Sequence, residues 1–358
     1  LGSDGERIVV GSSGDGSVHL FTGVGADFSG LIWQKKLASG TGAIGMPTFG
    51  NTDQFGRSVA IDGDRLAVGA PNDSTVGTNR GAMYLFSGLS TLGSKVDSPN
   101  GATFANNPDS TSYITPAIIT SLLDAGTAVT LQANNDITVL SPVLSSSDMR
   151  SPFTLQAGRN INFQANVRTP YGDLTAVAGD PAATAQYRDP GVPTITIASG
   201  VTLNVLTGTA TLAAIGGNII NNAGDSAISV INGFGRWLIY AADPATSTEG
   251  FSGYNKHYDQ SYASGDTPGY AATGNWFLYS LAPVLSVTPS NDSITYGNTP
   301  GFDPGLAGFI DGDTANSAGI GGSATWTVAG ATSSSGNPTA GSHDVVYSGG
   351  LASNLGYR

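Results

Sequence analysis

Short runs in which apolar and polar residues alternate dominate the chain, and Gly, Asn or Asp separates one run from the next. In SVAIDGDRLAV, residues 58–68, two such runs flank an acidic Asp-Gly pair. Alternation with a period of two predicts β-strands that turn one face toward a core. We find no long run with the 3.6-residue period of an amphipathic helix. The pattern therefore predicts an all-β protein.

Part of this pattern occurs twice near the start of the chain. DGERIVVG at residues 4–11 returns as DGDRLAVG at 62–69, an offset of 58, and VHLFTG at 18–23 returns as MYLFSG at 83–88. Self-similarity on this scale indicates two copies of one supersecondary unit. We expect each copy to hold a strand pair, a loop and an outer strand, with only the end of the first strand present in the first copy.

The second copy resembles an FG-GAP repeat, the blade unit of integrin-type β-propellers. The resemblance rests on Phe55-Gly56, the run SVAI, Gly69-Ala70-Pro71 within LAVGAP, and the closing GAMYLF. It implies FG-GAP/propeller-like blades over residues 1–90. Because a propeller has about four to eight blades, further chain or neighbouring molecules would be needed to close the ring.

A different repeat follows in the middle of the chain. VTLQANNDITV at residues 129–139 aligns with FTLQAGRNINF at 153–163, an offset of 24. Repeats of about 20–25 residues suit the rungs of a parallel β-helix, in which each rung hydrogen-bonds to the next. We expect Asn134, Asn160 and Asn222 at the corners, because Asn tolerates left-handed backbone and can form side-chain ladders.

Residues 112–287 resemble the shaft of filamentous-haemagglutinin-like adhesins, which are secreted by the two-partner route. The resemblance implies a short right-handed parallel β-helix, a place on the bacterial cell surface and an outer-membrane secretion partner. The aromatic pair GRWLIY and GNWFLY would cover the open last rung as an aromatic cap. The matching stretches are ITPAIITSLLDAGTAVTLQANNDITV (114–139), SPFTLQAGRNINFQANV (151–167), GRWLIYAADP (235–244), YNKHYDQSYA (254–263) and GNWFLYSLAPVLSV (274–287).

The last part of the chain resembles the MBG domain, a small β-sandwich module of bacterial surface proteins. Its matching residues are Thr295-Tyr296-Gly297, Gly308-Phe309, Asp311-Gly312-Asp313-Thr314, and AGSHDVVYSGG at 340–350 followed by ASNLGYR. The resemblance implies one more strand after the Asn-x-x-Tyr segment, where the sequence stops at Arg358. We expect an incomplete MBG-like β-sandwich with an unpaired sheet edge.

These patterns divide the chain into four segments. Residues 1–90 form the FG-GAP-like blades, and 91–112 are rich in Ser, Asn, Pro and Gly, which predicts a linker or a long loop. Residues 113–284 form the parallel β-helix of haemagglutinin type with its cap. The incomplete MBG-like domain takes residues 285–358.

Charge and composition narrow the function. Charged residues make up 11% of the chain, its formal net charge is −12, and it has no cysteine. Nucleic-acid binding needs clustered Lys and Arg, so the charge disfavours that function and an anionic membrane surface. Without cysteine, disulfides and thiolate metal sites are excluded. No run of about 18 apolar residues occurs, so we expect no transmembrane helix.

Several acidic pairs resemble parts of calcium loops. Calcium takes about six to eight oxygen ligands, whereas Asp62-Gly63 leaves only two residues between alternating strands, which favours a type I′ hairpin turn. We expect turns or solvated loops at all of these pairs and no cofactor, with calcium kept as the alternative. The residues concerned are Asp4-Gly5, Asp62, Asp64, Asn72, Asp73 and Asp311-Gly312-Asp313.

Catalytic motifs are missing from the sequence. His19, His257 and His343 fall in three different segments, and there is no Gly-x-Ser-x-Gly elbow or phosphate loop. β-Helices also host polysaccharide lyases and hydrolases, but the expected cluster of Asp, Arg and Lys does not occur in this shaft. We expect a protein that is not an enzyme, with a carbohydrate-active enzyme as the remote alternative.

The aromatic-rich segment 237–279 has two interpretations. Trp237, Tyr254, Tyr258 and Trp276 are candidates for stacking on a glycan, and Tyr240 and Tyr262 lie nearby in the sequence. A buried cap is the favoured interpretation. The exposure of the rings discriminates between the two interpretations, because a glycan platform requires several of these rings to line an open groove.

We therefore expect a non-enzymatic structural protein of the bacterial cell surface or extracellular space. It would be an adhesin or the subunit of a fibre that assembles as a homo-polymer, by strand addition between terminal sheet edges of neighbouring copies. The alternative is a carbohydrate-binding adhesin that uses the Trp/Tyr-rich segment to bind a glycan on a host surface, or that attaches to an abiotic surface.

Overall fold

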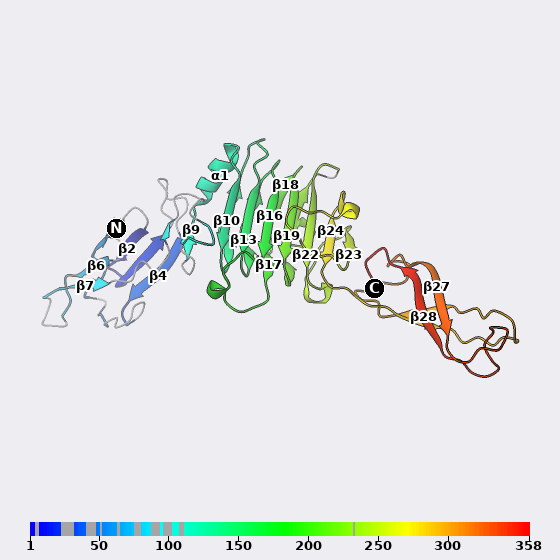
Figure 1. Cartoon of the computed structure of the whole chain (residues 1–358). Helices are drawn as coiled ribbons and strands as arrows, with labels where there is room; N and C mark the ends of the chain where they lie inside the picture. The colour runs from blue at the N-terminus through cyan, green and yellow to red at the C-terminus, as the bar shows by residue number, and fades with distance from the viewer. Residues whose placement is uncertain are drawn as a thin grey trace.

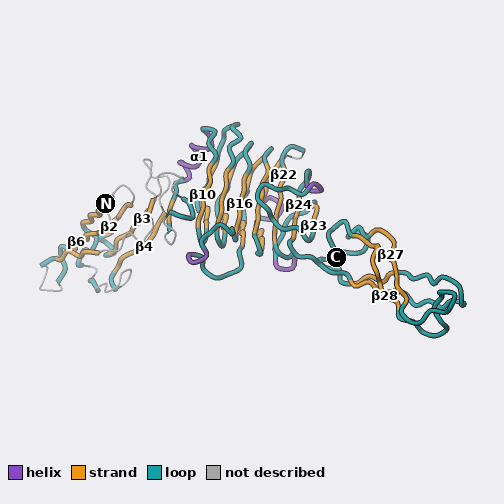
Figure 2. Tube along the Cα trace, viewed as in Figure 1, coloured by secondary structure: helices purple, strands orange, loops and turns teal. Residues whose placement is uncertain are grey.

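The computed structural model shows three parts that follow one another along the chain (Figure 1): N-terminal antiparallel strands, a stack of parallel strands, and C-terminal strand pairs. Strands and loops make up nearly all of the trace (Figure 2). The predicted all-β class is confirmed as a mostly β fold with one α-helix, and the stacked parallel sheets agree with the predicted parallel β-helix. The described residues are 1–3, 7–22, 32–40, 48–50, 52–62, 65–74, 80–86, 94–95, 102–106, 111–231 and 233–358.

The N-terminal part consists of two antiparallel sheets that share one hydrophobic cluster. Val9 and Leu20 from the first sheet and Leu66 and Val68 from the second belong to this cluster, and Phe55 is fully buried within it. The sheets contain β1 (Gly2–Ser3), β2 (Arg7–Ser12), β3 (Ser17–Thr22) and β4 (Ile32–Ala38), and β5 (Ser58–Asp62), β6 (Arg65–Ala70) and β7 (Ala82–Phe86).

The acidic hairpin differs slightly from its prediction. Asp62 pairs with Arg65, so β5 runs through Asp62 and the two connecting residues are 63 and 64 rather than 62 and 63. Residues 63 and 64 lie outside the described part of the chain, as do residues 4–6 with the predicted Asp4-Gly5 turn. The strand pairing supports a two-residue hairpin connection, as the alternating sequence on both sides predicts.

The middle of the chain is a stack of rungs, and the first four rungs each contain one strand from three parallel sheets. Each sheet is extended by one strand per rung, so the backbone groups of one rung pair with the next. The sheets contain, in order, β10 (Val129–Ala133), β13 (Phe153–Ala157), β16 (Leu174–Ala178), β19 (Thr209–Ala214), β22 (Arg236–Ala241), β24 (Trp276–Tyr279) and β23 (Asn255–His257); β11 (Ile137–Val139), β14 (Ile161–Phe163), β17 (Thr194–Ile197) and β20 (Asn218–Asn221); and β12 (Val143–Leu144), β15 (Val167–Arg168), β18 (Leu203–Leu206) and β21 (Ile228–Val230).

The predicted 24-residue offset is confirmed as the register of the first two rungs. Val129 pairs with Phe153, Ile137 with Ile161, and every residue of β10 has its partner 24 positions later in β13. The alternating residues face inward: Leu155 is fully buried, and the core runs through the whole stack. Burying such side chains contributes about 1.5–3 kcal/mol each.

Glycine marks one corner of the stack for a steric reason. A Cβ at Gly172 would lie 2.0 Å from the backbone oxygen of Ser151, and one at Gly208 would lie 2.3 Å from the oxygen of Gly172. Gly235 repeats the contact with Leu206 at 2.0 Å. Successive rungs therefore approach so closely at this corner that a side chain does not fit.

The expected role of asparagine at the corners is corrected. Asn134, Asn160 and Asn222 are all described, and none of them has a left-handed backbone. The Oδ1 atoms of Asn134 and Asn160 instead accept hydrogen bonds from backbone N–H groups, at 2.8 and 3.0 Å, across the corners. Asn222 is exposed, and its neighbour Asn221 is the buried residue that bonds to the backbone. Side-chain acceptance, rather than backbone freedom, places asparagine here.

The first rung is covered by a helix that the strand pattern did not predict. Helix α1 (Pro116–Asp124) begins at a proline and places Ile119 and Leu123 in the core of the stack. The preceding segment also contacts this rung, because Gln132 N donates to the carbonyl of Ala102 at 2.8 Å. Upstream, the short strands β8 (Ser94–Lys95) and β9 (Ser112–Tyr113) pair in parallel. The unpaired edge of β10 is thereby covered.

The C-terminal part consists of two antiparallel strand pairs, one formed by β25 (Ser286–Pro289) and β26 (Pro304–Ala307), the other by β27 (Gly321–Val328) and β28 (Val345–Ala352). Residues 284–356 are all described, and Ala318 is the one buried residue among them. Along β27 and β28, half-buried residues alternate with exposed ones. Each pair thus has a half-covered apolar face rather than a closed core.

Short 3-10 helices occur in the connections, and no helix of the described residues is long and apolar enough to cross a membrane. These helices are Ala185–Tyr187, Gly224–Ala227, Pro244–Thr246 and Gly269–Ala271.

Candidate functional site at the end of the β-helix

The aromatic pair of the sequence forms the last rungs of the stack. β22 and β24 lie side by side in parallel, with Leu238 opposite Trp276 and Ile239 opposite Phe277. The expectation that these segments cover the last rung is therefore corrected. The cover comes from the C-terminal part, since Ala318 and Tyr357 belong to the same core cluster as Phe277.

The four candidate glycan-stacking residues do not form one open surface. Trp237 is 3% exposed and Tyr258 is fully buried. Tyr254 is half-buried, with its ring 6.0 Å from Trp237 and 4.9 Å from Phe277. Trp276 is half-buried on the other face of the sheet, in the cluster that includes Leu278. Two of the rings are thus core residues, and the other two face different surroundings.

Trp276 takes part in a second aromatic group on the outer face of the first sheet. Tyr270 lies 5.4 Å from Trp276 and 4.2 Å from the ring of His257. Tyr240 and Tyr262 lie 5.1 Å apart, and burial raises the pKa of Tyr240 to about 12. The loop that carries Tyr262 and Tyr270 therefore covers the outer face of the last rungs.

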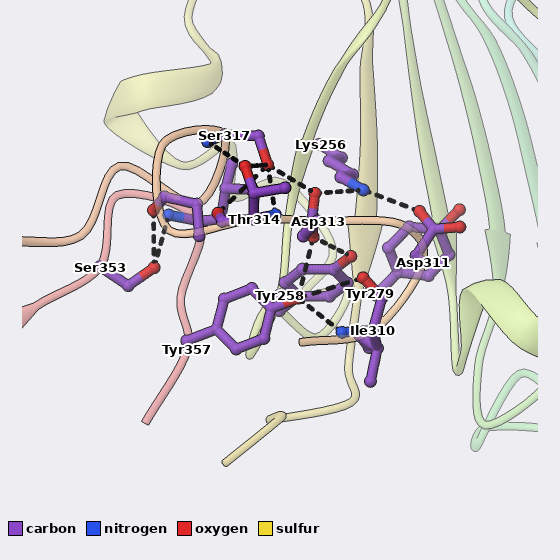
Figure 3. A network of polar contacts seen from close by, with 12 residues as sticks. Lys256, Tyr258, Tyr279, Ile310, Asp311, Asp313, Thr314, Ser317, Ser353 and Tyr357 are labelled. Carbon is purple, nitrogen blue, oxygen red and sulfur yellow. Dashed lines mark hydrogen bonds and ion pairs between the residues drawn. The ribbon is translucent and has the colours of Figure 1, made fainter. Parts of the chain in front are cut away.

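A polar network joins the end of the β-helix to the C-terminal part, and we call it the junction network (Lys256, Tyr258, Asp311, Asp313 and Tyr357) (Figure 3). Lys256 Nζ lies 2.9 Å from Asp313 Oδ1 and 2.8 Å from Asp311 Oδ2. The other oxygen of Asp313 accepts hydrogen bonds from the hydroxyls of Tyr258, at 2.8 Å, and Tyr357, at 2.9 Å. The Asp313 side chain is 4% exposed. Its negative charge is balanced by the Lys256 ammonium and by the two tyrosine hydroxyls rather than by solvent.

The turn at 311–313 is what presents these two carboxylates together. Asp311 has a φ of 53° and Gly312 a φ of 72°, so both adopt the left-handed conformation of a tight turn. The interpretation of this Asp-Gly-Asp as a turn agrees with the geometry. The cation beside it is the Lys256 ammonium, whose pKa is raised by hydrogen bonds to Asp311 and Asp313 against the effect of burial.

A second carboxylate sits among tyrosines in the same region. Glu249 accepts hydrogen bonds from the hydroxyls of Tyr254 and Tyr279. Burial and the nearby carboxylate raise the pKa of both tyrosines, and burial with Asp313 does the same for Tyr258. These hydroxyls therefore stay protonated and act as donors, which is the chemistry of a structural contact rather than of a base.

Backbone hydrogen bonds fix the same junction. Tyr258 N donates to the Leu355 carbonyl at 2.7 Å, so the chain after β28 continues the edge of the first sheet. Leu285 N donates to the Arg358 carbonyl, and Arg358 N to that of Pro283, both at 2.8 Å. Arg358 also forms an ion pair with Asp259. Arg358 is thus paired with the segment that leaves the β-helix.

The stability of the junction will depend on pH through His257. Burial lowers the pKa of His257 below its ordinary value of 6.5, although Nδ1 lies 2.5 Å from the Tyr258 carbonyl oxygen. Because the unfolded chain takes up this proton more readily than the folded one, the free energy of unfolding will fall as pH drops below about 6.5. Urea unfolding at pH 7.5 and 5.5 measures the loss, and His257→Phe, which keeps the stacking on Tyr270, will reduce it. An equal loss in the variant would contradict this role.

The remaining candidate residues are scattered. The expected solvated loop is wrong for Asp73, which is buried and accepts a hydrogen bond from Tyr84 at 2.5 Å. Asp62 is exposed on β5. Asn72, next to Asp73 in the chain, is half-buried, and Asp64 lies outside the described residues. Within the described part of the chain, no three His, Cys, Asp or Glu side chains come together to hold a metal ion.

The three histidines lie in different parts of the fold. His19 is in β3, with Ser17 and Trp33 beside its ring. His343 contacts the backbone oxygens of Ala329 and Thr339 in the C-terminal part. With His257 at the junction, they do not meet in one site.

Sequence reasoning missed most of the junction network. It named Tyr258 as a stacking candidate and Asp311 to Asp313 as a turn, but it gave no role to Lys256, Tyr357 or Glu249. The available signal was the pair of carboxylates in one turn, because a nearby cation would reduce the repulsion between them. The partner lies 55 residues away in the sequence, and no spacing rule points to it.

The comparisons with known proteins bear on the first part of the chain. No curated protein and no solved structure matches any part of the chain. One family, described as FG-GAP repeat, matches residues 50–86, which contain β5, β6 and β7. The antiparallel sheet described above and this match agree with the resemblance seen in Phe55-Gly56 and LAVGAP. Residues 50–86 are therefore an FG-GAP repeat, carried by a mostly β chain with stacked parallel sheets.

Proposed function

We propose that this chain is a non-enzymatic structural protein of the bacterial cell surface, an adhesin or the subunit of an extracellular fibre that assembles by strand addition between copies. The observation that carries the proposal is the half-covered C-terminal part. β27 and β28 pair only with each other among the described strands, and each has an unpaired outer edge. Two-stranded pairs are marginal by themselves, and exposed long edges pair readily with another chain.

The middle of the molecule supports a mechanical role. Both ends of its first sheet are covered, by residue 102 and α1 at one end and by Leu355 at the other. The junction network then ties the stack to the C-terminal part through a partly buried ion pair between Lys256 and Asp313. Such an arrangement suits a rod that transmits force between its two ends, and it leaves the outer strand pairs as the places for assembly.

The sequence resemblances support the location. The resemblance of residues 112–287 to filamentous-haemagglutinin-like shafts favours a secreted adhesin of the two-partner type, with a secretion partner in the outer membrane. The resemblance of the C-terminal part to the MBG domain favours the same location. A head-to-tail contact that repeats between identical copies would give an open filament.

Sedimentation velocity and electron microscopy of the purified chain test the proposal. We expect concentration-dependent assembly into elongated particles. Lysine at a strand edge opposes pairing, so Thr327→Lys in β27 will raise the concentration required by at least about tenfold. Thr130→Lys, the same change at an exposed position of β10, will leave assembly unchanged. A chain that stays monomeric at millimolar concentration, or equal assembly of both variants, would contradict the proposal.

A further inference from the structure

The third sheet of the β-helix ends before the first sheet does. Its strand order stops at β21, whereas the first sheet continues through β22 and β24. In the next rung, Thr248 still forms a bridge to Ile220 of the second sheet. Residues 249–254 then contribute no strand beside β21. One side of this rung is therefore missing.

The free edge of β21 presents backbone groups that can receive a strand. Ile231 N donates to the Leu206 carbonyl at 2.7 Å, toward β18. Alternate residues of a parallel strand direct their N–H and C=O groups to opposite sides, so Ile228 and Val230 direct theirs away from β18. Among the described residues, no hydrogen bond from another strand reaches these groups.

A hollow of about 440 Å³ lies along this edge. Trp237 and Phe251 supply its apolar part, and their rings are 4.8 Å apart. Two other lining residues are joined to each other, because the Asp225 carboxylate accepts hydrogen bonds from Ser252 N at 2.5 Å and from Ser252 Oγ at 3.0 Å. The lining thus combines an unpaired strand edge with apolar rings and polar side chains, as in sites that bind an extended peptide.

We propose that the edge of β21 is an acceptor site for a strand from a second copy of this chain, supplied by the outer edge of β27. This inference rests on the proposed assembly and names the surface that receives the strand. The continuity of the sheet argues for a strand as the occupant, because the added chain would extend the order β12, β15, β18, β21 by one position.

β27 has the features of the donor. With eight residues each, β27 and β28 are the longest of the described strands, and β27 pairs only with β28 on one side. Ala324, Trp326 and Val328 alternate with exposed polar residues on one half-buried face. In the acceptor, this apolar row would lie over Val230, which is itself half-buried against the core. Neither surface carries a basic patch that would select an acidic ligand instead.

Val230→Pro tests the acceptor edge directly. Proline removes the N–H that faces the hollow, while the groups of Ser229 and Ile231 that pair with β18 stay in place. Val230→Thr is the matched control, because it keeps the N–H and nearly the same shape. The probe is a fluorescein-labelled peptide of residues 321–328, with a scrambled peptide of the same composition beside it. Fluorescence anisotropy measures binding, and circular dichroism verifies that both variants are folded.

We expect the peptide to bind the wild-type chain and Val230→Thr alike, and Val230→Pro at least about fivefold more weakly, the effect of one lost hydrogen bond. Sedimentation velocity of the three full chains, without peptide, will show the same order. If all three assemble equally, the acceptor assignment is wrong and the assembly proposal stands. If the wild-type chain stays monomeric yet binds the peptide through the Val230 N–H, the acceptor stands and assembly between copies is wrong. If the wild-type chain stays monomeric and does not bind the peptide, both the acceptor assignment and the assembly proposal are wrong.

Discussion

Asp313→Ala will detach the C-terminal part from the β-helix and lower the free energy of unfolding by about 3 kcal/mol, because the buried Tyr258 hydroxyl loses its acceptor and a partly buried ion pair is broken. The change removes the carboxylate that Lys256 shares with the hydroxyls of Tyr258 and Tyr357. Lys256 keeps Asp311, whereas Tyr258 loses its acceptor inside the core. Limited proteolysis will then release residues 285–358 well before the β-helix unfolds, and thermal unfolding will show two separated transitions.

Two variants separate the network from a general loss of charge. Asp303→Ala removes an exposed carboxylate of the same part and will change stability by no more than about 0.5 kcal/mol. Asp313→Asn keeps a hydrogen-bond acceptor for one tyrosine but loses the ion pair, and it will fall between the two. Equal protease resistance of Asp313→Ala and the wild-type chain would show that the junction does not depend on this residue.

The parallel stack could be predicted where the sequence repeats itself. VTLQA and FTLQA align at the offset that the structure shows between β10 and β13. Later rungs are less regular, because segments of different length loop out between their strands; Ile161 of β14 pairs with Ile195 of β17, 34 positions later. The alternation of inward and outward residues can still be recognised when such insertions are present. The register between strands cannot, because it is set by contacts between rungs.

Two other features were outside the reach of the pattern. Helix α1 is nine residues long, too short for the periodicity of a helix to stand out from a buried strand, and it is stabilised by the rung that it covers. The junction depends on residues such as Tyr258 and Asp313 that are 55 positions apart. Their meeting follows from the docking of one part on another, which composition and spacing do not encode. The aromatic segment was noticed, but whether its rings face solvent or core is decided by the same docking.

Gly208→Ala will destabilise the β-helix by about 2–3 kcal/mol, the usual cost of forcing extra volume into a packed core. The added Cβ would lie 2.3 Å from the oxygen of Gly172 and 2.8 Å from its carbonyl carbon. Both are backbone atoms, so no rotamer change relieves the contact and the spacing of the rungs must widen. Because the corner stacks Gly172, Gly208 and Gly235 in successive rungs, the displacement will spread along it.

Two other glycines in the same part of the chain make the test specific. Gly269→Ala adds a Cβ with nothing within 4 Å and will be nearly neutral. Gly216 has equally open surroundings but a φ of 64°, so Gly216→Ala will cost about 1 kcal/mol of backbone strain. Urea unfolding of the three variants measures the order. If Gly208→Ala is no less stable than Gly216→Ala, the close approach of the rungs does not exclude a side chain at this corner. The predicted order requires instead that the close approach of one rung to the next is what excludes a side chain there.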